Sequence, residues 1–319
     1  VEDLAQRRLS GSTAVLTHTN NEALLVQNLL QQKGIPARLI ASQDGFSLKQ
    51  LLELRCFGWY VHDGIHNDHG FITKEVWRNG RNRINQEFEK SATLTLVLEV
   101  IDTFEKATGE RKYWAEYQAY LHEIRTEDFV FPDQNKVLVS TMHKAKGKEF
   151  DHVYLLLSNH TLKTESDKRV VYVAITRAKE SLHIHTDQSY FQNMEVPQLS
   201  LQQNDMQYPE PNLLQLELGM SDVWLGFFKR ESNQDGIKPL QAGQPLLIPS
   251  DPLTGLLDEV RSPVLKYSQK FKEKLQLFFH QGYQIDRAEV AYIVVWRCPD
   301  DGNSYRVVLG RIWISKEEN

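Results

Sequence analysis

The 319-residue sequence has few of the features that mark secreted, membrane-spanning or strongly basic proteins. Its two cysteines, Cys56 and Cys298, are too few for a disulfide framework, so we expect a reducing, cytoplasmic environment. Apolar runs such as Tyr154–Leu157 and Val290–Trp296 are far shorter than the roughly 20 residues of a membrane helix, and no signal-peptide pattern opens the chain. Its net charge of −5 excludes a generally basic nucleic-acid binder, so any such contact would need a local cluster of Lys and Arg.

Two separated segments of the chain have an α/β pattern. Short, apolar, partly β-branched runs predict strands at 12–18, 37–40, 136–140, 152–157 and 181–185, and amphipathic spacing predicts helices at 22–33 and 168–179. Thr19 and Asn20 can cap the first helix, and Gly34 can end it. The succession of strand, helix and strand indicates a parallel sheet, built from residues 1–43 and 136–190.

The rest of the chain has a different character. Residues 44–135 predict a helical insertion with helices that begin near Leu48 and span 92–107 and 113–124, and the Gln-, Asn- and Pro-rich stretch 191–212 predicts a linker. In the final part, 213–319, apolar spacing predicts a helix within 261–281, and strands at 290–297 and 305–314 flank an Asp-Gly turn. This pattern predicts a small α+β domain, whose aromatics and lysines are explained more simply by a core and a solvated surface than by nucleic-acid binding.

Three motifs lie in the sheet segments. Val139-Ser-Thr-Met-His-Lys-Ala-Lys-Gly-Lys-Glu-Phe-Asp-His-Val-Tyr154 resembles motif V, and Tyr172-Val-Ala-Ile-Thr-Arg-Ala178 resembles motif VI, of superfamily I DNA helicases of the UvrD, Rep and PcrA kind and of their RecB and AddA relatives. Ala14-Val-Leu-Thr-His-Thr-Asn20 resembles motif IV. The resemblance covers about residues 10–190 and implies the second RecA-like motor domain of such a helicase, an α/β fold of the P-loop NTPase type with a reduced second-domain insertion.

The resemblance implies a role for each matching residue. Arg177 would be the catalytic arginine finger, because arginine is always charged and offers a planar fork to phosphate oxygens. On the ATP side the further residues would be Gly147, Glu149 at the ribose, and Tyr172, which with Thr176 would position the finger. On the single-stranded DNA side they would be Thr141, His143, Lys144, Lys146 and Thr176. A loop that follows a parallel strand is expected at the carboxyl edge of the sheet.

One position departs from the family pattern. His18 stands where the motif IV resemblance implies a second phosphate-contacting arginine, and a histidine is mostly neutral at pH 7. His18 is therefore a weak candidate for the ATP site.

The sequence supplies only half of an ATP site. It contains no Gly-x-x-x-x-Gly-Lys-Ser/Thr loop for phosphates. We therefore expect ATP and Mg²⁺ to bind only together with an N-terminal RecA-like domain of a longer polypeptide, and the start at Val1 rather than Met agrees with this expectation. The hypothesis is the C-terminal motor portion of an ATP-dependent DNA helicase of DNA repair, inactive as an ATPase alone and moving 3′→5′ by family analogy.

Other functions remain open at this stage. The chain could be a non-catalytic DNA- or protein-binding module that kept the fold, which His18 favours, and 213–319 could bind a protein partner. The stretch His62-Asp-Gly-Ile-His-Asn-Asp-His69 has metal-ligand residue types, but its spacing matches no zinc pattern and a polar turn explains it. The Asp…Asp-x-Lys constellation of a RecB-type nuclease is absent, so we expect no metal site within the chain.

Overall fold

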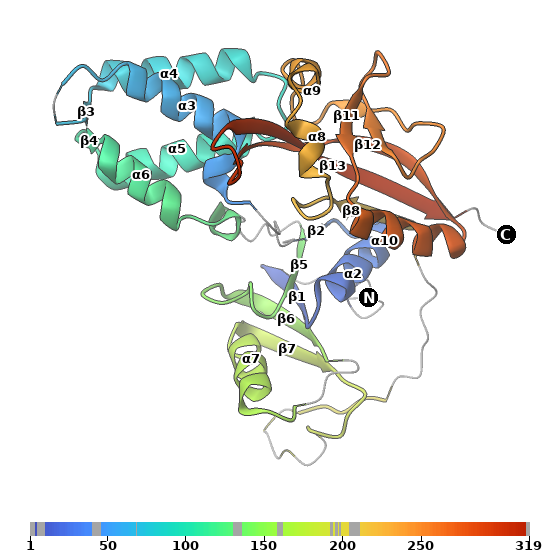
Figure 1. Cartoon of the computed structure of the whole chain (residues 1–319). Helices are drawn as coiled ribbons and strands as arrows, with labels where there is room; N and C mark the ends of the chain where they lie inside the picture. Colours follow the sequence, from blue (N-terminus) through green and yellow to red (C-terminus); the bar gives the residue numbers. More distant parts are fainter. Residues whose placement is uncertain are drawn as a thin grey trace. The chain divides into compact units, whose positions relative to one another are not determined.

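The computed structural model describes residues 4, 10–39, 46–67, 69–129, 136–157, 162–191, 194, 197, 199–203 and 211–316 (Figure 1). The chain divides into two compact units, each made of two segments. The first unit combines Val1–Ser42 with Val130–Leu214, and the second combines Gln43–Phe129 with Gln215–Asn319. The predicted linker at 191–212 lies in large part outside the described residues.

The first unit is built on a parallel sheet of five strands, which confirms the predicted α/β class. The strands lie in the order β2-β5-β1-β6-β7. They are β1 (Thr13–Thr17), β2 (Ala37–Leu39), β5 (Val137–Thr141), β6 (Phe150–Leu156) and β7 (Ala178–His185). All four neighbouring pairs are parallel, and every residue of the central strand β1 is buried, as expected for a strand covered on both faces.

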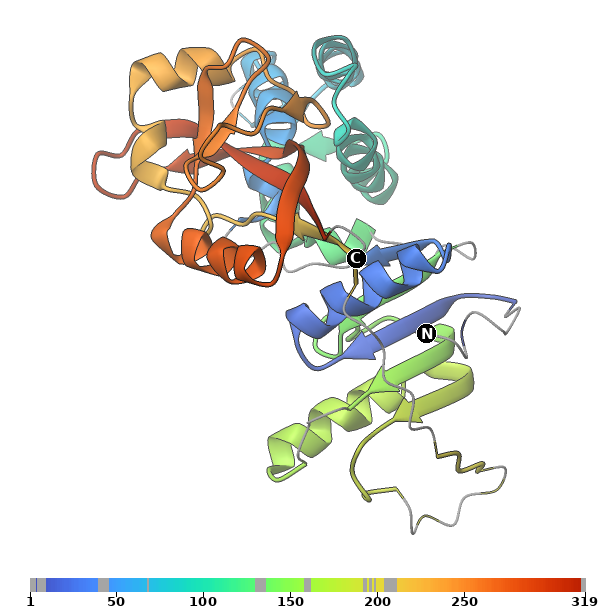
Figure 2. The same ribbon diagram turned by 90° about the vertical axis from the view of Figure 1, so that its right-hand side faces the viewer.

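Helices α2 (Asn20–Gln32) and α7 (Glu165–Ile175) cover opposite faces of this sheet (Figure 2). Each begins with a capping box, in which a threonine at the N-cap and an acidic residue three positions later satisfy each other's backbone N–H groups. The predicted helix 168–179 is wrong at both ends: it begins earlier, after the Thr164 cap, and Ala178 already belongs to β7. Arg177 therefore lies between helix and strand rather than within the last helical turn.

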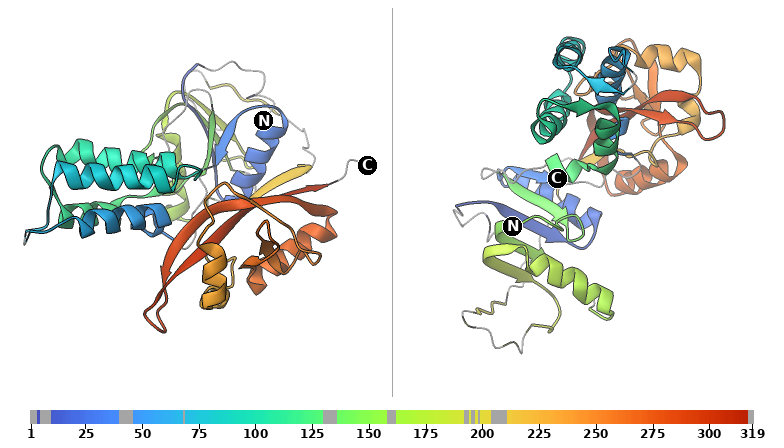
Figure 3. Two further views of the ribbon diagram at one scale, coloured as in Figure 1. Left: turned by 90° about the horizontal axis from the view of Figure 1, so that it is seen from above. Right: turned by 90° about the vertical axis from the view of Figure 1, so that its left-hand side faces the viewer.

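The second unit contains four helices that pack side by side (Figure 3). They are α3 (Leu52–Asp63), α4 (Lys74–Glu87), α5 (Leu94–Thr108) and α6 (Trp114–Glu123), with a short 3-10 turn η1 (Leu48–Gln50) before them and a ribbon of β3 (Phe71–Ile72) and β4 (Lys112–Tyr113). Four aromatic rings, Phe57, Trp77, Phe104 and Tyr117, meet in the core at centroid distances of 4.9–5.8 Å. Gly80 of α4 faces Phe57 closely, so that a Cβ there would lie 3.3 Å from its ring.

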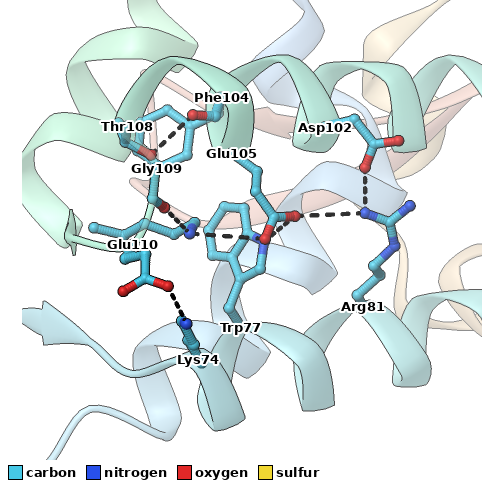
Figure 4. Close-up of polar contacts among 10 residues, drawn as sticks. Lys74, Trp77, Arg81, Asp102, Phe104, Glu105, Thr108, Gly109 and Glu110 are labelled. Atoms are coloured by element: carbon cyan, nitrogen blue, oxygen red, sulfur yellow. Dashed lines mark hydrogen bonds and ion pairs between the residues drawn. The ribbon is translucent and has the colours of Figure 1, made fainter.

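Charged residues connect α4, α5 and the segment that follows α5 (Figure 4). The Trp77 indole donates to Glu105 Oε2 at 3.2 Å, and Arg81 pairs with Asp102. The Lys112 side chain is only 4% exposed; its ammonium donates to the Gly109 carbonyl and lies 3.7 Å from Glu105 Oε1. Glu105 therefore carries the negative charge nearest to a buried ammonium group.

The second unit also contains a four-stranded sheet in the order β8-β13-β12-β9. Its strands are β8 (Leu213–Glu217), β9 (Pro245–Leu246), β12 (Tyr283–Arg297) and β13 (Ser304–Lys316). Around it lie the pair β10 (Gly255–Leu257) and β11 (Pro263–Lys266) and the helices α8 (Leu225–Phe228), α9 (Glu231–Ile237) and α10 (Gln269–His280). The predicted hairpin is confirmed, with Gly302 at a φ of 71° in its turn. The predicted helix within 261–281 is too long, because 263–266 form β11 and the Ser268 hydroxyl caps the helix.

Backbone contacts join the two segments of this unit. Leu51 forms an isolated bridge with Val294 of β12, and the Ala92 N–H donates to the Ala242 carbonyl at 2.9 Å. None of the described helices is long and apolar enough to cross a lipid bilayer.

Candidate functional site

The strand register places the predicted site residues at two opposite edges of the parallel sheet. Thr17 of β1 pairs with Thr141 of β5, and both end their strands, so His18 and Thr141 lie at the carboxyl edge. Phe150 of β6 pairs with Ala178 of β7, and both begin their strands, so Glu149 and Arg177 lie at the amino edge. The structure therefore does not bring His18 and Arg177 together.

At the carboxyl edge, the segment after β5 is fastened to the turn between β1 and α2. The Met142 N–H donates to the Thr17 carbonyl at 2.9 Å, and Lys144 Nζ donates to Asn20 Oδ1 at 3.1 Å. His18 and His143 are exposed, whereas Thr141 is 6% exposed. Two exposed imidazoles and the Lys144 ammonium thus lie at the ends of two paired strands, and such groups can contact phosphate oxygens.

Residues 142–149 lead from the carboxyl edge of β5 to the amino edge of β6. Met142 and Ala145 are each only 1% exposed and pack in the same cluster as Val171 and Ala174 of α7, so the segment crosses the sheet on the α7 face. Gly147 has a φ of 82°, a backbone conformation that a side chain would strain. The expectation that the whole loop lies at the carboxyl edge is wrong for its second half, because the loop must reach the start of the next parallel strand.

At the amino edge, the Arg177 side chain is held between α7 and this crossing segment. Its Nε donates to the Val173 carbonyl at 2.9 Å and its Nη1 to the Lys148 carbonyl at 3.2 Å. Its Nη2 donates to Thr176 Oγ1 at 3.2 Å, and its own carbonyl accepts from the Phe150 N–H at 2.8 Å. The half-buried guanidinium thereby connects Lys148, the residue before Glu149, to the end of α7.

The remaining candidates surround Arg177 with exposed groups. Tyr172 is 68% exposed on α7, one turn before Thr176, and Lys146 and Gly147 are exposed on the crossing segment. Glu149 lies 3.6 Å from Lys179 Nζ, with both side chains more than half exposed, so this ion pair contributes little to stability and can open easily.

Sequence reasoning missed a polar cluster at the same edge. The Ser12 N–H and hydroxyl both donate to Asp151 Oδ2, at 2.7 and 2.9 Å, and these bonds lower the pKa of the Asp151 carboxyl. Gly11 has a φ of 102°, and a Cβ there would lie 2.4 Å from Asp151 Oδ2. The buried His152 ring bridges Ser181 Oγ at 2.8 Å and the Ser10 carbonyl at 2.9 Å. The only signal in the sequence was the Ser-Gly-Ser run before a strand.

Within the described residues, no group of three or more His, Cys, Asp or Glu side chains gathers in a way that could hold a metal ion. The histidine-rich stretch begins in the last turn of α3, where the His62 ring packs against Trp114 at a centroid distance of 4.9 Å.

The parallel sheet, the crossing segment after β5 and the arginine that follows α7 define a RecA-like α/β domain. Residues 72–189 match the family model of the UvrD-like helicase C-terminal domain. The match runs from Ile72 of β3 to just beyond β7 and includes both 139–154 and 172–178. This match supports a C-terminal part of a UvrD-like helicase and, in general, a helicase-related function. A comparison with curated proteins found no match.

Proposed function

We propose that the chain is the C-terminal motor portion of an ATP-dependent DNA helicase or translocase. On this proposal the amino edge of the parallel sheet faces the nucleotide and the carboxyl edge contacts single-stranded DNA. The observation that carries the proposal is the hydrogen bond from Arg177 to the Lys148 carbonyl. This bond connects the arginine at the amino edge to the crossing segment, which begins next to Thr141 at the carboxyl edge.

Arg177 has the chemistry that an arginine finger needs. A guanidinium has five N–H groups, and three of those of Arg177 are engaged, so two can point to a phosphate oxygen. Glu149 can accept a hydrogen bond from a ribose hydroxyl, and Tyr172 and Gly147 lie on the segments that flank the finger. Because this sequence has no phosphate loop, ATP and Mg²⁺ would be held by an N-terminal RecA-like domain of a longer polypeptide, with the metal neutralising phosphate charge.

The carboxyl edge supplies donors for a DNA backbone. Thr141, His143 and Lys144 lie together there, and Lys146 adds charge on the crossing segment. We assign His18 to this edge as well, since it lies beside Thr141 rather than beside Arg177. The nucleotide site would then receive a single arginine from this chain.

The crossing segment offers a physical route between the two edges. Met142 and Ala145 of this segment are buried in the core cluster, so the segment is packed against the sheet at these two positions. When the finger engages a phosphate, a shift of the Lys148 carbonyl would move the backbone that leads to His143. Such a gated shift would couple hydrolysis to movement along DNA.

The DNA half of this proposal is testable with the chain itself. Binding of a fluorescent oligo-dT should weaken about tenfold in His143→Ala/Lys144→Ala, because two phosphate contacts are lost, and its salt dependence should become shallower. Lys33→Ala, an exposed lysine just after α2, serves as the control and should bind like the parent sequence. Equal binding by the double variant and the control would refute the assignment of the carboxyl edge to DNA.

The nucleotide half is tested by adding ATP to the purified chain. We expect no hydrolysis with or without oligo-dT, since this sequence has no phosphate-binding loop. DNA-stimulated hydrolysis by this chain alone would contradict the proposal of a divided site.

A further inference from the structure

The second unit contains a groove whose lining residues all belong to that unit. Its volume is about 780 Å³, and its walls come from η1, α3, α6 and the tip of the β12–β13 hairpin. The wall segments 49–62, 114–122 and 295–304 are distant in sequence and meet only in the fold. This volume is in the range of pockets that hold organic ligands, roughly 300–1,000 Å³.

The groove is positively charged although the chain is acidic overall. Its walls carry three permanent cations, Lys49, Arg55 and Arg297. Arg55 and Arg297 are exposed, and Lys49 Nζ lies 2.9 Å from His122 Nδ1. Among the residues that line the groove, all of them described, none is Asp or Glu. The charge of the walls therefore complements an anionic ligand.

The same groove exposes aromatic rings between these cations. Trp59 of α3 is 60% exposed, the largest exposed fraction of any described tryptophan. Trp77, by contrast, is only 2% exposed. Trp114 of α6 is half-buried in the opposite wall. An indole that remains in water costs free energy in the isolated protein, and such exposure is typical of a surface that stacks against a ligand.

We propose that this groove binds single-stranded DNA, with phosphates at Arg55 and Arg297 and an unpaired base stacked on Trp59. Interleaved cations and aromatic faces are the usual elements of single-strand binding surfaces. Duplex DNA would offer phosphates to the arginines but no free base face to Trp59, so the exposed indole favours a single strand. The groove is a second contact surface for the same single strand, and its residues differ from those of the carboxyl edge.

The electrostatic part of the proposal is tested by charge reversal. In Arg55→Glu/Arg297→Glu, the affinity of the full chain for a fluorescein-labelled oligo-dT should fall at least tenfold at low salt, and the slope of log K against log salt should decrease by about 1.4, that is 0.7 for each lost phosphate contact. The matched control is Lys270→Glu/Lys274→Glu, the same change of charge on exposed positions of α10 in the same unit. Equal losses in the two variants would show a nonspecific charge effect and overturn the proposal.

The stacking part is tested at the two exposed tryptophans. Trp59→Ala should weaken oligo-dT binding by about 5- to 100-fold, the usual range for loss of one base stack, whereas Trp224→Ala should change it less than twofold. Trp224 is 49% exposed and does not line the groove, so it matches Trp59 in residue type and in exposure. Both positions are exposed, so neither change threatens folding.

Photo-crosslinking locates the contact directly. An oligonucleotide that carries 5-iododeoxyuridine should crosslink to the peptide containing Trp59, and the yield should survive His143→Ala/Lys144→Ala because that pair belongs to the other unit. Crosslinking only at residues of the first unit, or equal competition by duplex DNA, would overturn the groove proposal while leaving the proposed motor function standing.

Discussion

We expect the charge of Glu105 to stabilise the second unit, because it lies 3.7 Å from the buried ammonium of Lys112. The change Glu105→Gln keeps the shape and the acceptor for the Trp77 indole but removes the negative charge that lies 3.7 Å from Lys112 Nζ (Figure 4). At that distance and an effective dielectric constant of about 20, the attraction between two unit charges is about 4.5 kcal/mol. Glu105 is 43% exposed, which weakens the attraction, and Arg81 keeps Asp102 as its partner. We therefore expect the variant to lose about 2 kcal/mol, somewhat less than the 3–5 kcal/mol typical of breaking a fully buried pair.

Urea unfolding followed by tryptophan fluorescence measures this loss. The six tryptophans, Trp59, Trp77, Trp114, Trp224, Trp296 and Trp313, all belong to the second unit, so the signal reports that unit alone. The control is Glu110→Gln, which removes the same charge from the exposed pair of Lys74 and Glu110, whose side chains are 70% and 80% exposed, and it should change the stability far less. Equal losses from the two variants, or a change in the slope m, would refute the reasoning.

Three further predictions concern the first unit. The Ser12 bonds lower the pKa of the Asp151 carboxyl in the folded protein. The carboxylate therefore stabilises the fold above its unfolded pKa near 3.9, and this stabilisation is lost as the pH falls through the lower folded pKa. Amide exchange of β1 and β6 should accordingly show a steeper loss of protection below about pH 4 in the natural sequence than in Asp151→Asn. Thr164→Ala removes the N-cap of α7 and should cost about 1 kcal/mol by exchange in that helix, whereas Lys163→Ala next to it should cost almost nothing. Gly11→Ala places a Cβ against Asp151 and should cost more than Gly147→Ala, which has open space around its Cβ; the reverse order in thermal melts would contradict the described backbone.

Strong local patterns predicted the centre of the first unit. The strand at 12–18 and the helix that follows it were readable because an apolar β-branched run precedes a capping box and a helix-ending glycine, and the structure has β1 and α2 there. Helix α4 was missed because only Val76, Trp77 and Ile84 are apolar in it, so its burial depends on aromatic partners from other helices. The strand β12 begins seven residues before the predicted position, because bulges between Ile285 and Arg287 and between Val290 and Tyr292 break the two-residue period.

The residue types of the candidate site were readable from sequence, but their arrangement was not. The motifs pointed to Thr141 and Arg177, yet the division into two edges depends on which strand pairs with which, and no local pattern encodes that register. Likewise Ser12 and Asp151 are 139 positions apart, so their contact arises only when β1 and β6 pair. The basic groove is a similar case, since Arg55 and Arg297 meet through tertiary folding.

The most direct test of the proposed motor role is the ATPase activity of Arg177→Ala and Arg177→Lys in the longer polypeptide that carries the N-terminal RecA-like domain. Loss of the finger should lower DNA-stimulated kcat by about 10³- to 10⁵-fold, and Arg177→Lys should rescue little because an ammonium lacks the planar fork. Oligo-dT binding should persist, and Arg38→Ala, an exposed arginine on β2, should hydrolyse ATP normally. Unchanged turnover in Arg177→Ala would contradict the account and favour a non-catalytic binding module.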